Sequence, residues 1–376
     1  MTEPGRTLPY EPGLDGLRAV SIVGVLSFHA CATSGLDGWF RGGNLGVSVF
    51  FTLSGFLITS LLLTEQARTG RVDLARFWTR RIRRLVAPSL TVVLAVTLLS
   101  GTSWFDLRAG DALAAVWSAT NWHVIVGGQD RLLQTIVGPL GPTWSLAVEE
   151  QFYVVLAAGA WLAGRTRRPV TALGVGAAAV VATSVVVANT VSTWSPRLEF
   201  GTDVRAAEMA IGCLVAIGVH RYRERLLARA SLVDAAGLVA LVAIGVAFLT
   251  AGTAPWLLRG GHALLALVWA AAVAGVLVHG RLHRALAVGP LVAVGRWSYS
   301  LYLVHWPAFL VLNADRTGLD GVALVAVKLV AAVVLGLVLH VLVERPVRAA
   351  RTTTVPTVLA WLGASLGVSL LAVGRL

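Results

Sequence analysis

Apolar stretches long enough to cross a lipid bilayer recur along the whole length of this sequence. A bilayer core of about 30 Å needs about 20 predominantly apolar residues in a helix. Such stretches lie at residues 16–34, 44–64, 85–104, 143–163, 169–190, 203–220, 231–251, 262–279, 288–312, 321–343 and 355–373. Since backbone polar groups in lipid must be satisfied within their own segment, we predict an all-α, polytopic integral membrane helical bundle of about 10–11 transmembrane helices.

Composition and charge placement agree with a membrane protein. Only 13% of the residues are charged, against about 25% in soluble domains. With the N-terminus in the cytoplasm, twenty arginines fall in inner segments and seven in outer segments. This positive-inside bias predicts an N-in topology. It also accounts for the net charge of +12 without a nucleic-acid partner.

Two of the predicted spans are less apolar than the others. Their ionisable residues are Asp203, Arg205 and Glu208 in residues 203–220, and Arg296 and His305 in residues 288–312. Arg205 and Glu208 are three residues apart, a spacing at which opposite charges on a helix pair. We expect this pair to be structural first. The alternative is that Arg205 lines a substrate cavity.

The first span contains two ionisable side chains, Arg18 and His29, eleven residues apart. Eleven steps of about 100° bring a helix to within roughly 20° of its starting direction, with a rise of about 16 Å. Both groups therefore share one face of the helix. Ionisable residues at membrane depth are candidate functional sites. The alternatives are an arginine that reaches the interface and a histidine that only bonds a neighbouring helix.

Adjacent carboxylates, Glu149 and Glu150, lie in the span that begins with TWSLAVEEQFY. Carboxylates in an apolar span are costly unless they are partnered. Glu149 shares a helix face with Ser145, and one hypothesis is that it orients the imidazole of His29. The other is a structural ion pair with Arg205 or Arg296.

A third polar stripe lies in the segment WSYSLYLVHWP. Ser298, Tyr302 and His305 follow one another at i, i+4 and i+7, which places them on one helix face. Hydroxyls and an imidazole on one stripe suit the binding of a sugar or a second proton relay. A network that only joins helices is the alternative.

An arginine-rich segment precedes the span at residues 85–104. Its arginines are Arg76, Arg80, Arg81, Arg83 and Arg84. Apolar residues at helical spacing opposite these arginines predict a helix along the inner membrane surface over residues 65–84. The cations either anchor this helix or bind phosphate groups, for which several cations are needed.

Several common chemistries have no signature in the sequence. It has no G-x-S-x-G motif and no phosphate-binding G-x-x-x-x-G-K-[ST] motif. His123, His279 and His283 show no spacing typical of zinc ligands, so we expect no metal. We expect residues 1–376 to form a single membrane domain without an appended soluble domain.

Six motifs together resemble the membrane acyltransferase-3 family. They are LDGLRAVSIVGVLSFHA, NLGVSVFFTLSGFLIT, FWTRRIRRLVAP, TWSLAVEEQFYVV, WSYSLYLVHWP and VERPVR. The resemblance implies a multi-pass protein of the bacterial inner (cytoplasmic) membrane that transfers an acyl group to a carbohydrate hydroxyl. It implies acetyl-CoA or another short acyl-CoA as donor, and as acceptor a cell-envelope glycan or the sugar of a glycosylated natural product such as a macrolide. The family's arginine and histidine, with ten residues between them, match Arg18 and His29.

The combined hypothesis is an acyl-CoA-dependent O-acyltransferase in the lipid bilayer. His29 acts as general base or carries the acyl group, with Glu149 and Arg18 as the other catalytic residues. The arginine-rich segment binds coenzyme A, while Tyr302, His305, Ser298 and Arg205 contact the acceptor. The alternative is a transporter of an acyl group or small polar solute, since buried histidine and arginine also suit proton-coupled transport.

Overall fold

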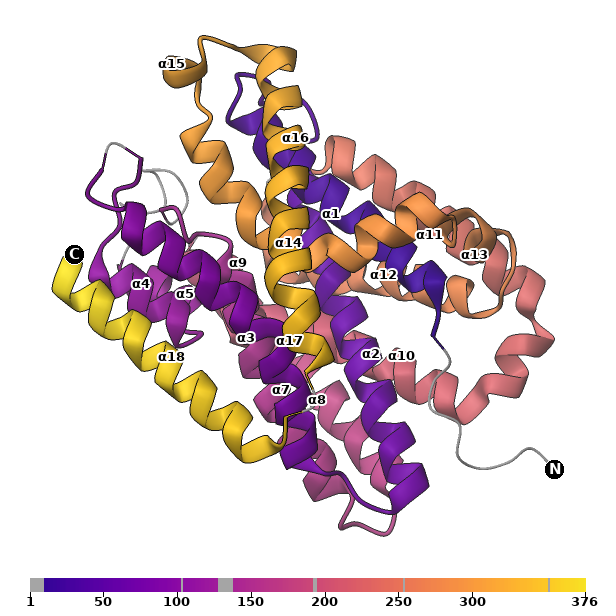
Figure 1. Ribbon diagram of the computed structural model, residues 1–376. Helices are drawn as coiled ribbons and strands as arrows, with labels where there is room; N and C mark the ends of the chain where they lie inside the picture. The colour runs from indigo at the N-terminus through magenta and orange to yellow at the C-terminus, as the bar shows by residue number, and fades with distance from the viewer. Residues whose placement is uncertain (1–9, 103, 128–137, 192–194, 253, 351) are drawn as a thin grey trace. The chain divides into compact units, whose positions relative to one another are not determined.

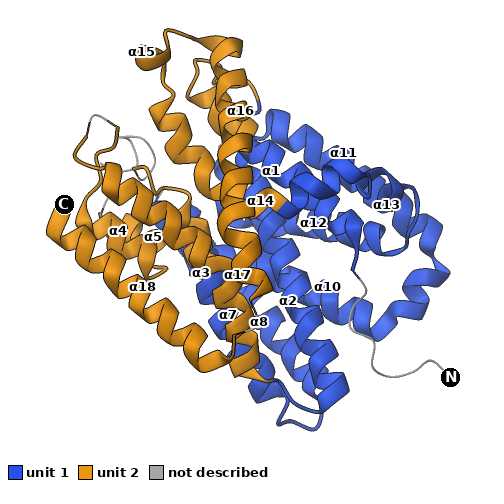
Figure 2. Cartoon of the chain, viewed as in Figure 1, with its two compact units in different colours: residues 1–25, 40–72, 149–296 blue, residues 26–39, 73–148, 297–376 orange. Residues whose placement is uncertain are grey.

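The computed structural model describes residues 10–102, 104–127, 138–191, 195–252, 254–350 and 352–376. These residues are largely helical and include no strand, so the predicted all-α fold class is confirmed (Figure 1). The chain divides into two compact units (Figure 2). Unit 1 comprises residues 1–25, 40–72 and 149–296, and unit 2 comprises residues 26–39, 73–148 and 297–376.

Three long helices contribute residues to both units. They are α1 (Pro12–Ala32), α7 (Thr143–Ala163) and α14 (Gly289–Val311). Unit 1 also contains α2 (Gly46–Thr69), α8 (Pro169–Thr190), α9 (Pro196–Phe200), α10 (Thr202–Ala228), α11 (Ala230–Thr250), α12 (His262–Leu277) and α13 (Arg281–Leu286). Unit 2 contains α3 (Leu74–Leu99), α4 (Ala109–Val116), α5 (Thr120–Gly127), α15 (Ala314–Thr317), α16 (Gly321–Leu339), α17 (Arg345–Ala349) and α18 (Thr354–Arg375). Short 3-10 or π-type turns lie at Gly43–Leu45, Leu257–Gly261 and His340–Glu344.

Within the described residues, nine helical stretches are long and apolar enough to cross a membrane. The predicted spans at 203–220 and 288–312 are not among them, although both segments form long helices, α10 and α14. In α10 the reason is charge, because acidic and basic side chains occupy its first turns and arginines its last. These two helices are therefore long but less apolar than the nine stretches.

The arginine-rich segment differs from its prediction. It does not form a separate surface helix, because α3 runs without interruption from Leu74 to Leu99 and contains both that segment and the following span. The side chain of Asp73 caps this helix by accepting the backbone N–H of Arg76 at 2.9 Å. Pro88 lies inside the helix without ending it.

Close backbone contact between α2 and α10 organises the core of unit 1. A Cβ atom on Gly55 would lie 1.9 Å from the carbonyl oxygen of Met209, and one on Gly212 would lie 2.1 Å from that of Thr52. Glycine on each helix therefore lets the other backbone approach, as small residues do between membrane helices. Apolar side chains including Leu53, Phe56, Ile211 and Trp269 fill the surrounding core.

In unit 2, polar contacts join α3 to the C-terminal helices. Thr79 donates to the hydroxyl of Thr354 at the start of α18 at 2.8 Å, and Arg83 donates to the carbonyl of Ala350 at 2.8 Å. Tyr299 of α14 donates to the carbonyl of Leu85 at 2.6 Å. These bonds hold α3 against α14 and against the chain that leads into α18.

The contact between α2 and α10 gives a first prediction. We expect Gly212→Ala to lower the unfolding free energy by about 1–3 kcal/mol, because the added methyl group must push two backbones apart. Gly218→Ala is the matched control on the same helix, since nothing lies within 4 Å of its Cβ position. Thermal unfolding of both variants in the same detergent checks this. Equal midpoints would contradict the account.

Candidate active site

A pair of histidines forms the centre of the polar site in unit 2. His29, near the end of α1, and His305 of α14 face each other, with His29 Nδ1 3.1 Å from His305 Nε2. Their ring centroids are 5.1 Å apart. His305 is fully buried and His29 is half-buried. The pair therefore has one enclosed member and one closer to the surface.

Hydrogen bonding to the backbone assigns the tautomers of both rings. His305 Nδ1 lies 2.6 Å from the carbonyl oxygen of Tyr302. A carbonyl oxygen only accepts, so Nδ1 of His305 is the protonated nitrogen, and Nε2 of the neutral ring is an acceptor. His29 Nδ1 must then donate to it. This arrangement leaves the basic lone pair of His29 on Nε2.

Tyr302 and Trp306 fix the helix around this pair. The Tyr302 hydroxyl lies 2.6 Å from Ser145 Oγ and donates to the carbonyl of Pro142 at 3.1 Å. Trp306 stands 5.0 Å from the His29 ring and donates through its indole N–H to the carbonyl of Gly138 at 2.8 Å. Trp306 thus packs against His29, while the Tyr302 ring lies 5.4 Å from that of His305.

The predicted stripe on α14 is brought together in part. Tyr302 and His305 both belong to the hydrogen-bonded chain that ends at His29, as their spacing on one helix face suggested. Ser298 is buried, one turn before Tyr302 on the helix. Whether any of the three contacts an acceptor stays a prediction.

Lys328 was missed as a site residue by sequence reasoning. Its ammonium group is buried in α16 and donates to the carbonyl and hydroxyl oxygens of Thr33 at 2.6 and 2.7 Å, and to Ser34 at 3.1 Å. Thr33 in turn donates to the carbonyl of His29 at 2.7 Å. A cation at the last carbonyls of a helix stabilises that end. The available signal was one lysine, alone of its type, in an otherwise apolar span.

Glu149 has hydroxyl partners in unit 1. Its carboxylate accepts hydrogen bonds from Ser54 and from Tyr153. Arg296, one of its two predicted ion-pair partners, contacts the Tyr10 hydroxyl at 2.8 Å and lies 3.8 Å from the carboxylate of Asp15. The role of Glu149 at His29 stays a prediction.

The predicted pair of Arg205 and Glu208 is confirmed. Arg205 Nε lies 2.9 Å from a carboxylate oxygen of Glu208, and both side chains are buried. The other guanidinium nitrogens donate to the carbonyl of Glu199 at 3.0 Å and to Ser48 at 3.1 Å. His262 completes the cluster, 3.3 Å from Ser48 and 3.5 Å from Glu208. Each charge in this cluster is held by several partners.

Arg18 is half-buried on α1. Because α1 is continuous from Pro12 to Ala32, Arg18 and His29 belong to one helix, as the sequence predicted.

The five arginines of α3 do not act as one group. Arg81 is buried, with its guanidinium 6.0 Å from the Phe77 ring, and Arg83 bonds the backbone at Ala350. The remaining members are Arg76, Arg80 and Arg84. They follow one another at i, i+4 and i+8, so they share one face of the helix. Only this set is positioned as a common cationic surface.

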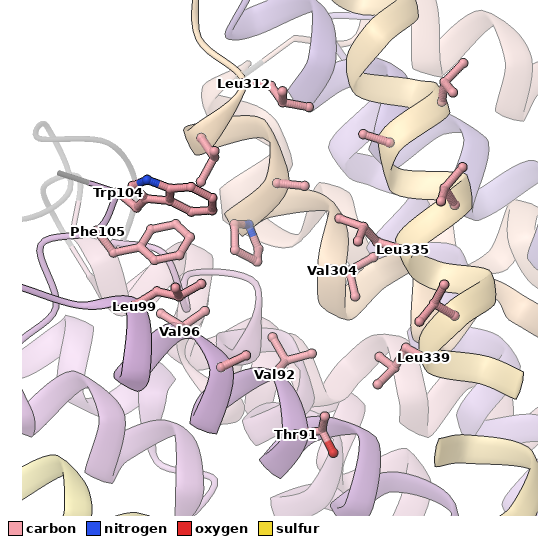
Figure 3. Close-up of a pocket in the computed structure, with 18 of the residues that line it drawn as sticks. Thr91, Val92, Val96, Leu99, Trp104, Phe105, Val304, Leu312, Leu335 and Leu339 are labelled. Carbon is pink, nitrogen blue, oxygen red and sulfur yellow. The ribbon is translucent and has the colours of Figure 1, made fainter. Parts of the chain in front are cut away.

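An apolar pocket of about 1040 Å³ lies in unit 2 among α3, α14 and α16 (Figure 3). Trp104 and Phe105 contribute to one end, and Thr91 is the one hydroxyl-bearing side chain among the lining residues. Walls of this kind suit a hydrocarbon chain and not a sugar or a phosphate. The pocket could not be predicted from the sequence, because segments far apart along the chain line it.

Comparison with known proteins places the chain in a family. The sequence pattern of acyltransferase-3, described as an acyltransferase domain, matches residues 11–345. The chain belongs to the acyltransferase-3 family. It is 31% identical over 325 residues to O-acetyltransferase OatA of Staphylococcus aureus strain NCTC 8325, which covers 81% of this chain and 51% of that protein. OatA of strains COL and MRSA252 gives the same values.

The chain thus spans about half the length of the curated relatives it matches. No solved structure matches it. The recognition of the family from its six motifs is confirmed.

The buried cluster around Arg205 gives a second prediction. We expect Arg205→Met to lower the unfolding free energy by about 3–5 kcal/mol, because it leaves the carboxylate of Glu208 buried without its counter-charge. Arg223→Met removes an exposed arginine from the same helix and serves as control. Unfolding in denaturant compares the two, and similar values would show that the pair contributes little.

Proposed function

We propose that this protein is an integral membrane O-acyltransferase that transfers a short acyl group, acetyl first among them, from acyl-CoA to a carbohydrate hydroxyl. The acceptor class is a cell-envelope glycan or the sugar of a glycosylated natural product. The observation that carries the proposal is the His29–His305 pair, in which the buried His305 accepts from Nδ1 of His29 and so leaves the basic lone pair on Nε2. Membership of the acyltransferase-3 family and O-acetyltransferase relatives support the same chemistry.

In this proposal His29 is the general base. Its Nε2 takes the proton of the acceptor hydroxyl while the hydroxyl oxygen attacks the thioester carbonyl. The tetrahedral intermediate then collapses with cleavage of the C–S bond. The thiolate of coenzyme A leaves and receives the same proton from the imidazolium. Transfer of the acyl group through Nε2 of His29 is the covalent variant of this route.

His305 positions the base. By accepting a hydrogen bond from Nδ1 of His29, it holds the ring in one tautomer and stabilises the imidazolium that forms. The sequence-based hypothesis places Glu149 in this role; Glu149 enters the proposal only as a further carboxylate to be tested. Lys328 holds the last turn of α1 through Thr33, which donates to the carbonyl of His29.

The donor is proposed to bind from the cytoplasmic side. Arg76, Arg80 and Arg84 offer one cationic face to the phosphates of coenzyme A. Arg18 precedes His29 by about 16 Å of helix rise, a distance that suits the extended pantetheine arm. The predicted N-in topology places both arginine groups near the inner surface of a bacterial cytoplasmic membrane.

A direct test uses purified protein in lipid nanodiscs with acetyl-CoA labelled in the acetyl group. We expect release of free coenzyme A to depend on an added glycan, and the label to appear as an ester on that glycan. In a parallel assay with the protein in sealed lipid vesicles, label that crosses the membrane without release of coenzyme A would identify a transporter and contradict the proposal.

Substitutions at the histidine pair give a third prediction. We expect His29→Ala to lower kcat by about 10²–10⁴, the usual contribution of a general base. His305→Gln should retain more activity than His305→Ala, because an amide oxygen can still accept a hydrogen bond from Nδ1 of His29. His220→Ala, an exposed histidine on α10, is the control. Wild-type kcat in His29→Ala would refute the role of His29.

The cationic face of α3 gives a fourth prediction. Replacing Arg76, Arg80 and Arg84 together by Gln should raise KM for acetyl-CoA by at least about tenfold, with a smaller effect on kcat, because charge-assisted phosphate contacts are lost.

The matched control replaces Arg165, Arg167 and Arg168 by Gln, which removes equal charge from another predicted inner loop. An equal rise in KM in the control would mean that the overall positive charge of the inner surface attracts acetyl-CoA, and not this face of α3 in particular.

A further inference from the structure

Glu11, His279 and His283 converge outside the site described above. All three belong to unit 1 (Figure 2). They lie beyond the ends of the membrane-spanning stretches Pro12–Ala32 and Leu257–Leu277. Glu11 Oε2 is 3.0 Å from His279 Nε2 and 3.9 Å from His283 Nδ1. The three ligand atoms all lie within 4.8 Å of one another. The proposed acyl transfer uses none of these groups.

We propose that these residues form a binding site for a divalent transition metal, Zn²⁺ by its chemistry, that clamps the start of α1 to the turn between α12 and α13. Two imidazoles and one carboxylate are a common ligand set for Zn²⁺. With bonds of about 2.0–2.1 Å, tetrahedral ligand atoms are about 3.3 Å apart. The observed separations bracket this value, so small side-chain movements suffice.

The charge of the cluster suits a dication. One carboxylate and two neutral imidazoles carry a single negative charge, and Glu11 is largely buried, with 11% of its side chain exposed. His279 is 53% exposed, so a metal ion has access from solvent. Three protein ligands leave a fourth position for water.

The turn that carries His279 is held in place by its surroundings. His279 has a φ of 55°, in the left-handed region that a residue with a side chain seldom adopts. Asp234 fixes the following residues by accepting the N–H groups of Arg281 at 2.9 Å and Leu282 at 3.0 Å. Gly280 is required there, because a Cβ would lie 2.3 Å from the carboxylate of Asp234. A ligand on such a turn is preorganised.

The start of α1 is fitted against the same place. A Cβ on Gly13 would lie 2.7 Å from Val276 and 3.1 Å from His283 Nδ1, so glycine allows this approach. His283 Nδ1 also lies 3.2 Å from the carbonyl oxygen of Val276. Metal binding at Nδ1 exchanges that hydrogen bond for a coordinate bond and moves the ring proton to Nε2.

Sequence reasoning missed this site. His279 and His283 are separated by three residues, a spacing that occurs between histidine ligands of zinc, but this pair alone does not make a site. Glu11 is 268 residues away from His279. Only the packing of α1 on α13 brings the carboxylate to the imidazoles.

The test measures metal on the full chain in detergent. Protein stripped with a chelator is given Zn²⁺, desalted and analysed for metal by mass spectrometry. We expect about one Zn²⁺ retained per wild-type chain, and at least about tenfold less in His279→Ala and in Glu11→Gln, because the loss of a ligand weakens binding. His220→Ala is the matched control and should bind as the wild type does.

Cobalt provides a second measurement that needs no variant. Co²⁺ added to stripped wild-type protein should give visible absorption bands of a low-symmetry four-coordinate site, and Zn²⁺ should abolish them. Absence of both the bands and retained zinc would overturn the proposal and leave an ion pair only. Equal zinc retention in wild type, His279→Ala and Glu11→Gln would also overturn it, because the metal would then lie elsewhere.

Discussion

The structure depends on one constraint: a polar group placed among apolar helices must find its partner inside the protein. Lys328, buried in α16, satisfies its ammonium group with Thr33 and Ser34. Arg205 is held in the same way by Glu208 and Ser48. Because each such group costs several kcal/mol when unpaired, these contacts fix which helix faces meet.

The histidine pair obeys the same constraint, and the constraint sets which ring nitrogen is basic. His305 is enclosed, so its Nδ1 must donate to the nearest acceptor, the carbonyl of Tyr302. That bond determines the role of Nε2, and through it the tautomer of His29. The need to satisfy a buried N–H group thereby leaves Nε2 of His29 as the basic nitrogen. A general base needs such an unprotonated nitrogen. Membership of the acyltransferase-3 family agrees with an acyl-transfer role for this nitrogen.

Sequence reasoning predicted what depends on one segment. Apolar length gave the helices, and the i, i+3 spacing gave the Arg205–Glu208 pair. It failed where the decisive neighbour is remote: nothing local links His29 to a histidine 276 residues away. The prediction of a separate surface helix before residue 85 was wrong, because the change from charged to apolar residues lies inside α3 and does not end a helix. The cap at Asp73 marks the true start.

The most direct test of the account is the protonation state of His29 itself. Protein carrying ¹⁵N-labelled histidine in lipid bilayers reports by NMR which ring nitrogen holds the proton, and comparison with His29→Ala identifies the signals. The account predicts a neutral ring with its hydrogen on Nδ1 and no hydrogen on Nε2. It also predicts a coupling between His29 Nδ1 and His305 Nε2 across their hydrogen bond. A His29 ring that carries its proton on Nε2 at neutral pH would contradict it.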